Sequence, residues 1–279
     1  MPSTVDLYCV MGHPVEHSRS PWIHARFAAL TAQTLHYTRE LVALDGFAAA
    51  VQAFAAGGGR GCNVTVPFKL QAAELADSCS ERVQLAGAAN TLVLAEGRIH
   101  ADNTDGLGLV ADIRDNAGQP IAGRDVLLIG AGGAAAGALG PLLAEQPRRI
   151  VVVNRTLEKA QALVERHAAL AARHGVDLAA QGLESAGHFD LVINASASSL
   201  GGAAVPVAAS VLRPGCLAYD MMYGPAAQGF LDWAAQHGAR GRDGLGMLVE
   251  QAAEAFALWR GVRPAGAPVL AELRALVGQ

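Results

Sequence analysis

The chain has 279 residues, of which 52% are hydrophobic, so it is long enough to bury the cores of about two domains. Its net charge is −4 and its basic residues form no dense run, which argues against a nucleic-acid partner and favours a small-molecule ligand. The four cysteines and nine histidines are scattered without zinc-ligand spacing, so we expect free thiols and no metal site.

The first residues, "MPSTVDLYCVMGHP", lack the basic and apolar regions of a signal peptide. No uninterrupted apolar run reaches the length of about 18 residues that a membrane helix needs. We therefore expect a cytoplasmic protein without a membrane partner, present as a monomer or homodimer.

Apolar runs of strand length alternate with segments of helical period along the first third of the chain. The pattern predicts strands at 7–12, 35–43 and 62–66 and helices at 21–30, 46–56 and 70–76. A hairpin should follow within 90–106, with its turn at Glu96-Gly97, and then a helix over 107–117. The turn-rich stretch 116–123 is typical of a linker between domains.

The strongest local signal is "DVLLIGAGGAAAGALGPLL" (125–143), an apolar strand that runs into a glycine turn and a helix of small residues. Gly130 permits the tight turn, Gly132 lets the backbone approach a pyrophosphate, and Ala135 lets helix and strand pack closely. A helix start here offers N–H groups and a positive dipole to phosphates. The pattern indicates a dinucleotide-binding unit, and Pro141 is expected to kink or shorten its helix.

The next strand (149–156) ends in Asn154-Arg155-Thr156, where an NAD enzyme normally places a carboxylate for the ribose 2′-hydroxyl. A guanidinium can instead pair with a 2′-phosphate, so this ending favours NADP, with Lys159 one turn further on. The alternative is that Arg155 and Lys159 form an ordinary solvated helix start. Further strands at 190–196 and 216–223 complete a doubly wound sheet.

These elements predict a two-domain α/β protein. Residues 1–105, completed by 244–279, should form an N-terminal α/β substrate domain to which the C-terminal helices return. Residues 106–243 should form a Rossmann-type NADP-binding domain.

One of only two lysines stands in "NVTVPFK" (63–69). In an extended stretch Asn63, Thr65 and, beyond the bend at Pro67, Lys69 can face one cleft, while Val64 and Val66 face the core. Phe68 can then fill the core and hold the lysine backbone. Lysine can exchange a proton, whereas arginine has no accessible neutral form. The alternative for Lys69 is a solvated lysine at a helix start.

At this point the sequence resembles a known family, the shikimate dehydrogenases. "GHPVEHSRSP" (12–21), "NVTVPFK", "GAANT" (87–91) and "DNTDG" (102–106) are similar to its substrate and catalytic motifs. "GAGGAAAG" (130–137), "NRT" (154–156), "YDMMYGP" (219–225) and "GLGMLVEQAAEAFALW" (244–259) continue the resemblance in family order.

The resemblance implies reversible NADPH-dependent reduction of 3-dehydroshikimate to shikimate, in the pathway to chorismate and the aromatic amino acids. Lys69 would be the catalytic lysine and Asp105 its carboxylate partner. The implied substrate residues are Ser18, Ser20, Thr65, Lys69, Asn90, Asp105, Tyr223 and Gln251. The implied cofactor residues are Gly130, Ala131, Gly132, Gly133, Ala134, Asn154, Arg155, Thr156, Lys159, Ser196, Met221, Gly244 and Met247.

Structural alternatives exist for several of these residues. Ser20 before Pro21 can be a helix cap, Asp105 can close an Asx turn, and Tyr223 can pack on Pro225. Two departures weaken the expected grip on the cofactor: Ser196 and Ala197 replace a threonine and a serine, and Lys159 replaces a frequent arginine. The competing functions are a quinate/shikimate dehydrogenase that uses NAD or both cofactors, and a non-catalytic NADPH sensor.

Overall fold

The computed structural model describes residues 5–184, 187–196, 198 and 204–278, and the chain folds into two compact units. Unit 1 is the chain up to Thr104 together with Val249–Leu273, and unit 2 is Asp105–Leu248 with the residues from Arg274 onward. The chain changes units one residue before the expected first boundary and five residues after the expected second one. Unit 2 also includes the residues from Arg274 onward, which the sequence assigns to the substrate domain.

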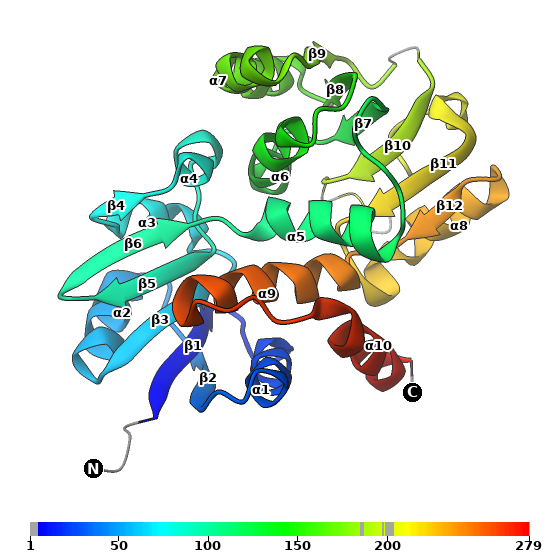
Figure 1. Cartoon of the computed structure of the whole chain (residues 1–279). Coiled ribbons are helices and arrows are strands. Elements are labelled where there is room, and N and C mark those ends of the chain that lie inside the picture. Colours follow the sequence, from blue (N-terminus) through cyan, green and yellow to red (C-terminus); the bar gives the residue numbers. More distant parts are fainter. Residues whose placement is uncertain (1–4, 185–186, 197, 199–203, 279) are drawn as a thin grey trace. The chain divides into compact units, whose positions relative to one another are not determined.

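Unit 1 is built on a mixed sheet that has six strands within the described residues, in the order β2-β1-β3-β5-β6-β4 (Figure 1). The strands are β1 Asp6–Gly12, β2 Leu35–Leu41, β3 Gly59–Val64, β4 Ser78–Cys79, β5 Thr91–Ala95 and β6 Arg98–Asp102. Its helices are α1 Ser20–Leu30, α2 Phe47–Ala56, α3 Lys69–Leu75 and α4 Glu81–Ala86. The predicted hairpin is present, with positive φ at Glu96 and Gly97.

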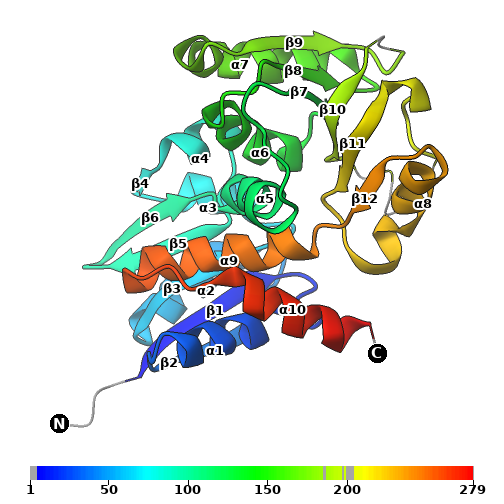
Figure 2. The same cartoon turned by 45° about the vertical axis from the view of Figure 1, so that its right-hand side comes forward.

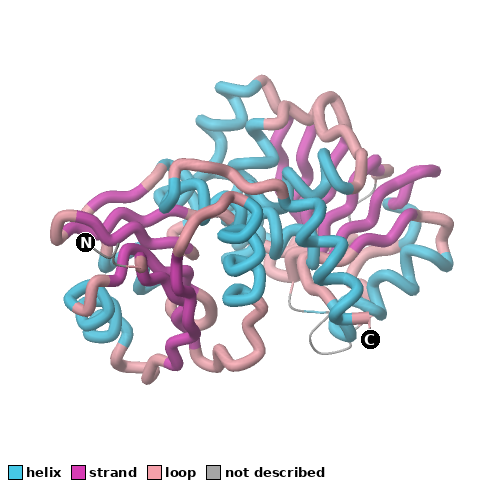
Figure 3. The backbone as a smooth tube through the Cα atoms, turned by 60° about the horizontal axis from the view of Figure 1, so that its bottom comes forward, coloured by secondary structure: helices cyan, strands magenta, loops and turns pink. Residues whose placement is uncertain are grey.

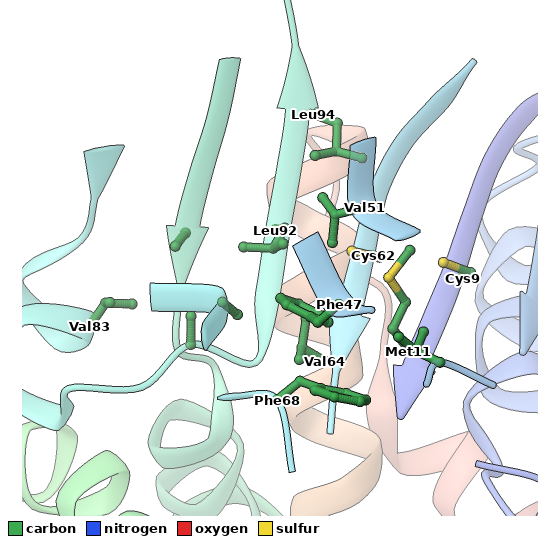
Figure 4. Packing of buried hydrophobic residues seen from close by; sticks show 14 residues of the cluster. Cys9, Met11, Phe47, Val51, Cys62, Val64, Phe68, Val83, Leu92 and Leu94 are labelled. Carbon is green, nitrogen blue, oxygen red and sulfur yellow. The ribbon is translucent and has the colours of Figure 1, made fainter. Parts of the chain in front are cut away.

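Side chains of β1 alternate between two cores, because successive residues of a strand point to opposite faces. Cys9 and Met11 pack with Phe47 and Phe68 under α2 and α3 (Figure 4). Tyr8 and Val10 lie on the other face, where Tyr8 stacks on Trp259 of α9 (Leu245–Arg260). Figure 2 shows α1 and α9 beside β1. Because both faces of β1 are covered by apolar side chains, only residues beyond the ends of the strands can contribute to a functional site.

Unit 2 contains a sheet in the order β12-β11-β10-β7-β8-β9, parallel throughout its described strands. The strands are β7 Asp125–Ile129, β8 Arg149–Val153, β9 Asp177–Gln181, β10 Phe189–Asn194, β11 Leu212–Asp220 and β12 Arg240–Arg242. The main helices of unit 2 are α5 Asp105–Ala111, continued as a π-helix over Asp112–Asn116, α6 Gly133–Ala144, α7 Leu157–His174 and α8 Gln228–Gln236. α10 Gly266–Val277 belongs to unit 1 as far as Leu273 and to unit 2 from Arg274 onward.

Numbered from β7, the strand order of unit 2 is 3-2-1-4-5-6, the doubly wound order of dinucleotide-binding folds. α6 connects β7 to β8, α7 connects β8 to β9, and α8 lies between β11 and β12 in the chain. In each unit helices flank the sheet (Figure 3). The predicted α/β fold class is confirmed.

Of the two expected effects of Pro141, a kink or a shorter helix, the shortening does not occur, because α6 continues to Ala144. Pro141 has no N–H to donate to the carbonyl of Gly137. That carbonyl instead lies against Gly106 of α5, where an added Cβ would come within 2.3 Å of it. The absence of a side chain at Gly106 therefore lets α5 and α6 pack closely at this turn.

Candidate functional site

A cavity of about 740 Å³ lies in unit 2, at the C-terminal ends of β7, β8 and β10. In a doubly wound sheet ligands bind at this edge, where the strand order reverses. Ten of the thirteen expected cofactor residues line the cavity: Gly130, Ala131, Gly132, Gly133, Ala134, Asn154, Arg155, Thr156, Lys159 and Ser196. Unit 2 therefore has a cavity at the edge of the sheet where dinucleotides bind, and most of the expected cofactor residues line it.

The glycine turn of the cavity depends on the absence of a side chain at Gly130. This residue has φ of +107°, and an added Cβ would lie 3.0 Å from the carbonyl oxygen of Ala195. α6 begins directly after Gly132, which provides no side-chain cap to the helix. Ala135 is fully buried against the sheet, as the close packing of helix and strand requires.

The basic end of the cavity follows β8. Asn154 donates from Nδ2 to the carbonyl of Thr156 at 2.8 Å, which fixes the turn that carries Arg155. Arg155 and Lys159 are exposed, and neither forms an ion pair with a described residue. The described lining of the cavity includes no carboxylate. Two available cations without a competing acid fit a phosphate group.

The hydroxyl of Ser196 is already engaged inside unit 2. It donates to Oδ1 of Asn194 at 2.7 Å, and Asn194 donates from Nδ2 to Asp220 at 3.1 Å. Ala197, the other departure from the family pattern, lies outside the described residues. The hydrogen bond to Asn194 therefore holds the hydroxyl of Ser196 in place in the cavity wall.

Three expected cofactor residues, Met221, Gly244 and Met247, do not line the cavity. Gly244 nevertheless has a steric reason to be glycine, because an added Cβ would lie 2.3 Å from the carbonyl oxygen of Met221. Sequence reasoning missed seven of the described lining residues: Ile129, Leu183, Ala195, Ser198, Ala204, Pro206 and Met222. Three of these had a signal: Ile129 belongs to the strand before the glycine turn, Ala195 to the strand predicted at 190–196, and Met222 to "YDMMYGP".

In unit 1, Lys69 is the first residue of α3, and its carbonyl accepts a hydrogen bond from the amide of Ala89 at 2.8 Å. The preceding Phe68 is fully buried and stacks on Phe47 with ring centroids 5.0 Å apart, as expected (Figure 4). The prediction for Val66 is wrong, because its side chain is 65% exposed. β3 ends at Val64, so the alternation of faces does not continue to Val66.

Ser18 and Ser20 belong to one loop that hydrogen bonds hold in place. Oγ of Ser18 accepts from the amide of Ser20 at 3.3 Å, and the guanidinium of Arg39 donates twice to the carbonyl of Ser18 at 2.7 and 3.0 Å. α1 starts at Ser20 with Arg19 in the cap position, and no side chain caps it. The alternative of Ser20 as a helix cap is therefore wrong.

Asn90 and Gln251 come together although 161 residues separate them. Nδ2 of Asn90 donates to Oε1 of Gln251 at 3.2 Å, and Oδ1 of Asn90 accepts from the amide of Thr104 at 2.9 Å. Asn90 is 3% exposed and Gln251 is 9% exposed. Thr65 is half-buried, and its methyl group packs against Gly12. Unit 1 thus gathers several of the expected substrate residues near the C-terminal ends of β1 and β3.

The two other expected substrate residues belong to unit 2. Asp105 is the first residue of α5 and lies in its first turn, and Tyr223 is 39% exposed directly before Gly224. Among the described residues no group of three or more histidine, cysteine, aspartate or glutamate side chains could hold a metal ion. No helix in the described part of the chain is long and apolar enough to span a bilayer.

Comparisons with known proteins find similar sequences and structures over nearly the whole chain. Three family models match: the shikimate dehydrogenase substrate binding domain over residues 10–92, shikimate / quinate 5-dehydrogenase over 113–201, and the shikimate 5′-dehydrogenase C-terminal domain over 244–274. A relative from Acidovorax sp. (strain JS42), called shikimate dehydrogenase (NADP(+)), is 73% identical over 99% of both chains.

Two solved structures resemble the whole chain. An Ael1 enzyme from Pseudomonas putida is 47% identical with a TM-score of 0.90, over 96% of this chain and 98% of its own. Shikimate 5-dehydrogenase from Thermus thermophilus, in complex with NADP(H) and shikimate, is 30% identical with a TM-score of 0.84, over 97% of this chain and 99% of its own.

Proposed function

The chain belongs to the shikimate dehydrogenase family, and we propose that it catalyses the reversible NADPH-dependent reduction of 3-dehydroshikimate to shikimate, in the pathway to chorismate and the aromatic amino acids. The observation that carries the cofactor choice is the unit 2 cavity, lined by the glycine turn and by Arg155 and Lys159 without a described carboxylate. The residues present therefore fit NADP.

NADPH supplies a hydride when it is bound. A hydride that arrives at a carbonyl carbon leaves negative charge on the oxygen, and an ammonium group both stabilises that charge and can donate the proton. We assign this role to Lys69 and the role of its carboxylate partner to Asp105, because an opposite charge keeps an amine protonated and oriented. Both residues are present, which argues against a non-catalytic sensor.

The substrate contacts are proposed in the same way. Ser18 and Ser20 bind the carboxylate of shikimate together with Tyr223, and Thr65, Asn90, Asp105 and Gln251 bind its hydroxyl groups. Hydrogen bonds hold the loop of Ser18 and the buried amide of Asn90 in place. They support this assignment, because groups that are already held in position lose little freedom when a ligand binds. Gly244, Met221 and Met247 are proposed as further cofactor contacts.

A steady-state assay tests the proposal. Oxidation of shikimate and of quinate is followed with NADP and with NAD, and we expect the highest kcat/KM for shikimate with NADP. Efficient turnover of quinate with NAD would support the rival dehydrogenase instead. Cytoplasmic location and a monomeric or homodimeric state remain proposals, and light scattering coupled to size-exclusion chromatography measures the latter.

A further inference from the structure

A continuous chain of buried side chains leads from the interior of unit 1 to the proposed substrate residues. Tyr37 donates from its hydroxyl to Oδ1 of Asn63 at 2.7 Å, and Asn63 donates from Nδ2 to Oγ1 of Thr91 at 3.1 Å. Thr91 donates to Oδ1 of Asn90 at 2.9 Å, and Asn90 donates to Oε1 of Gln251 at 3.2 Å. None of the five side chains is more than 9% exposed.

Two backbone groups settle the direction of this chain. The carbonyl of Asn90 can only accept, so the end of the Asn63 amide that lies 3.3 Å from it is the nitrogen. The amide N–H of Thr104 can only donate, so the end of the Asn90 side chain that lies 2.9 Å from it is the oxygen. The hydroxyl of Tyr37 must then donate to Asn63.

The direction passes through Thr91. Its Oγ1 accepts from Asn63, so its single hydrogen is directed to Oδ1 of Asn90. The nitrogen of Asn90 therefore faces Gln251, and the oxygen of Gln251 is the end that faces Asn90. The other end of the Gln251 amide is a nitrogen, which only donates.

The ring of Tyr37 is held in place as firmly as its hydroxyl. It stacks on His24 with ring centroids 4.3 Å apart and an angle of 7° between the planes. His24 is fully buried, and neither of its ring nitrogens has a hydrogen-bond partner among the described residues. The stacked ring of His24 therefore packs against the ring of Tyr37 and holds it with its hydroxyl directed at Asn63.

We infer that Tyr37, Asn63 and Thr91 are positioning residues that fix the amides of Asn90 and Gln251 and thereby set the affinity for shikimate. This inference rests on the proposed function of Asn90 and Gln251 as substrate contacts. None of the three residues is needed at the reacting carbon, so they act on binding and leave the chemical step to Lys69.

Two isosteric variants test the inference. Tyr37→Phe removes the donor to Asn63, and Thr91→Val removes the link between Asn63 and Asn90. Each leaves a buried polar group without its partner. We expect each variant to raise the KM for shikimate about tenfold, with kcat changed less than about threefold and the KM for NADP unchanged. Isothermal titration calorimetry with shikimate should give the same weakening in Kd.

The matched control is Tyr8→Phe. Tyr8 pairs with Tyr37 in the β1–β2 register, belongs to the same hydrophobic cluster and is also buried, but its hydroxyl faces Arg260 at 3.4 Å. We expect this variant to keep the wild-type KM for shikimate. Thr91→Ser retains the hydroxyl and should restore most of the affinity that Thr91→Val loses.

A double-mutant cycle separates a connected chain from two independent losses. In a chain the double variant Tyr37→Phe/Thr91→Val raises KM little beyond the larger single effect, whereas independent losses multiply to about a hundredfold. Wild-type KM in both single variants, a tenfold rise in Tyr8→Phe, or full multiplication would overturn the inference. Wild-type protein that does not oxidise shikimate would instead overturn the proposed function, and the inference with it.

Discussion

Lys69 stands at the first position of α3, where a positive charge is disfavoured by the helix dipole. Its backbone is held from two sides, by the buried ring of Phe68 and by the hydrogen bond from Ala89. A lysine fixed at a position that does not favour a cation is not explained by helix stability. We propose that its place is explained by the proton that the reaction needs.

Lys69→Ala tests this explanation. We expect kcat to fall by about 10³-fold, because both charge stabilisation and proton donation at the reacting oxygen are lost, while shikimate still binds through its other contacts. Lys159→Ala is the matched control, since it removes the only other lysine and should raise the KM for NADP with kcat retained. Equal loss of kcat in both variants, measured at saturating substrates, would contradict the assignment.

His24 gives a second residue-level prediction. Burial lowers its pKa from the ordinary value of 6.5 to about 3, and the side chain of Asn63 offsets this only in part. The unfolded chain therefore takes up a proton below pH 6.5 that the folded protein does not. The stability associated with neutral His24 is complete above pH 6.5 and declines by about 1.4 kcal/mol for each pH unit down to about pH 3.

His24→Phe removes this dependence. The variant should be less stable than wild type at pH 7, because a larger ring enters a packed core, and it should recover about 2 kcal/mol relative to wild type at pH 5. Urea unfolding monitored by circular dichroism at both pH values measures the difference. Parallel stability curves for the two proteins would mean that His24 titrates alike in the folded and unfolded chain.

At the level of elements, the connection from β8 to α7 determines which cofactor can bind. Arg155 lies in the connection just before α7 and Lys159 lies in the first turn of the helix, and both line the cavity. We expect Arg155→Asp to reduce kcat/KM for NADP by about a hundredfold and to improve it for NAD, because a carboxylate repels a 2′-phosphate and can bind a 2′-hydroxyl. Arg166→Asp, the same charge change on an exposed part of α7, should leave the cofactor preference unaltered. Steady-state kinetics with both cofactors decides between these outcomes.

The elements that the sequence predicted are those with a strong local pattern. The strand and glycine turn that lead into α6 are recognisable because each residue there satisfies a local requirement, as Gly130 and Ala135 do. The short strands β4, β9 and β12 have no such pattern, since their residues become strands by pairing with neighbours that the sequence does not reveal. The prediction that Val66 faces the core was wrong for a related reason, because the end of β3 depends on its pairing with β1, which the sequence does not reveal.

Among the site residues, those with a motif were predicted and those that act through tertiary contacts were not. Asn90 and Gln251 were named separately by resemblance, but only the fold brings the two amides together. Tyr37 and His24 had no signal in the sequence, because an aromatic residue in a strand and a histidine in a helix are ordinary core residues. Their importance comes from stacking and from one hydrogen bond, both of which are long-range.

At the scale of the whole molecule, unit 1 is not a continuous segment. It includes residues of α9, and Trp259 stacks on Tyr8 at 4.7 Å and donates from Nε1 to the carbonyl of Leu92 at 3.0 Å. Gly61 leaves room for this indole, since an added Cβ would lie 2.3 Å from Nε1. The core of unit 1 is thus completed only after the whole of unit 2 up to Leu248 has been synthesised.

We expect helix α9 to couple the stability of the two units. α9 continues without a break across the boundary between Leu248 and Val249, so unfolding one unit removes helical turns from the other. We expect calorimetry to show one cooperative transition, which NADP at about 100 times its Kd stabilises by about 2.7 kcal/mol. NAD at the same concentration should shift the transition much less, and Arg155→Asp should remove the difference. Two separate transitions, of which NADP moves only one, would show that the continuous helix does not couple the units.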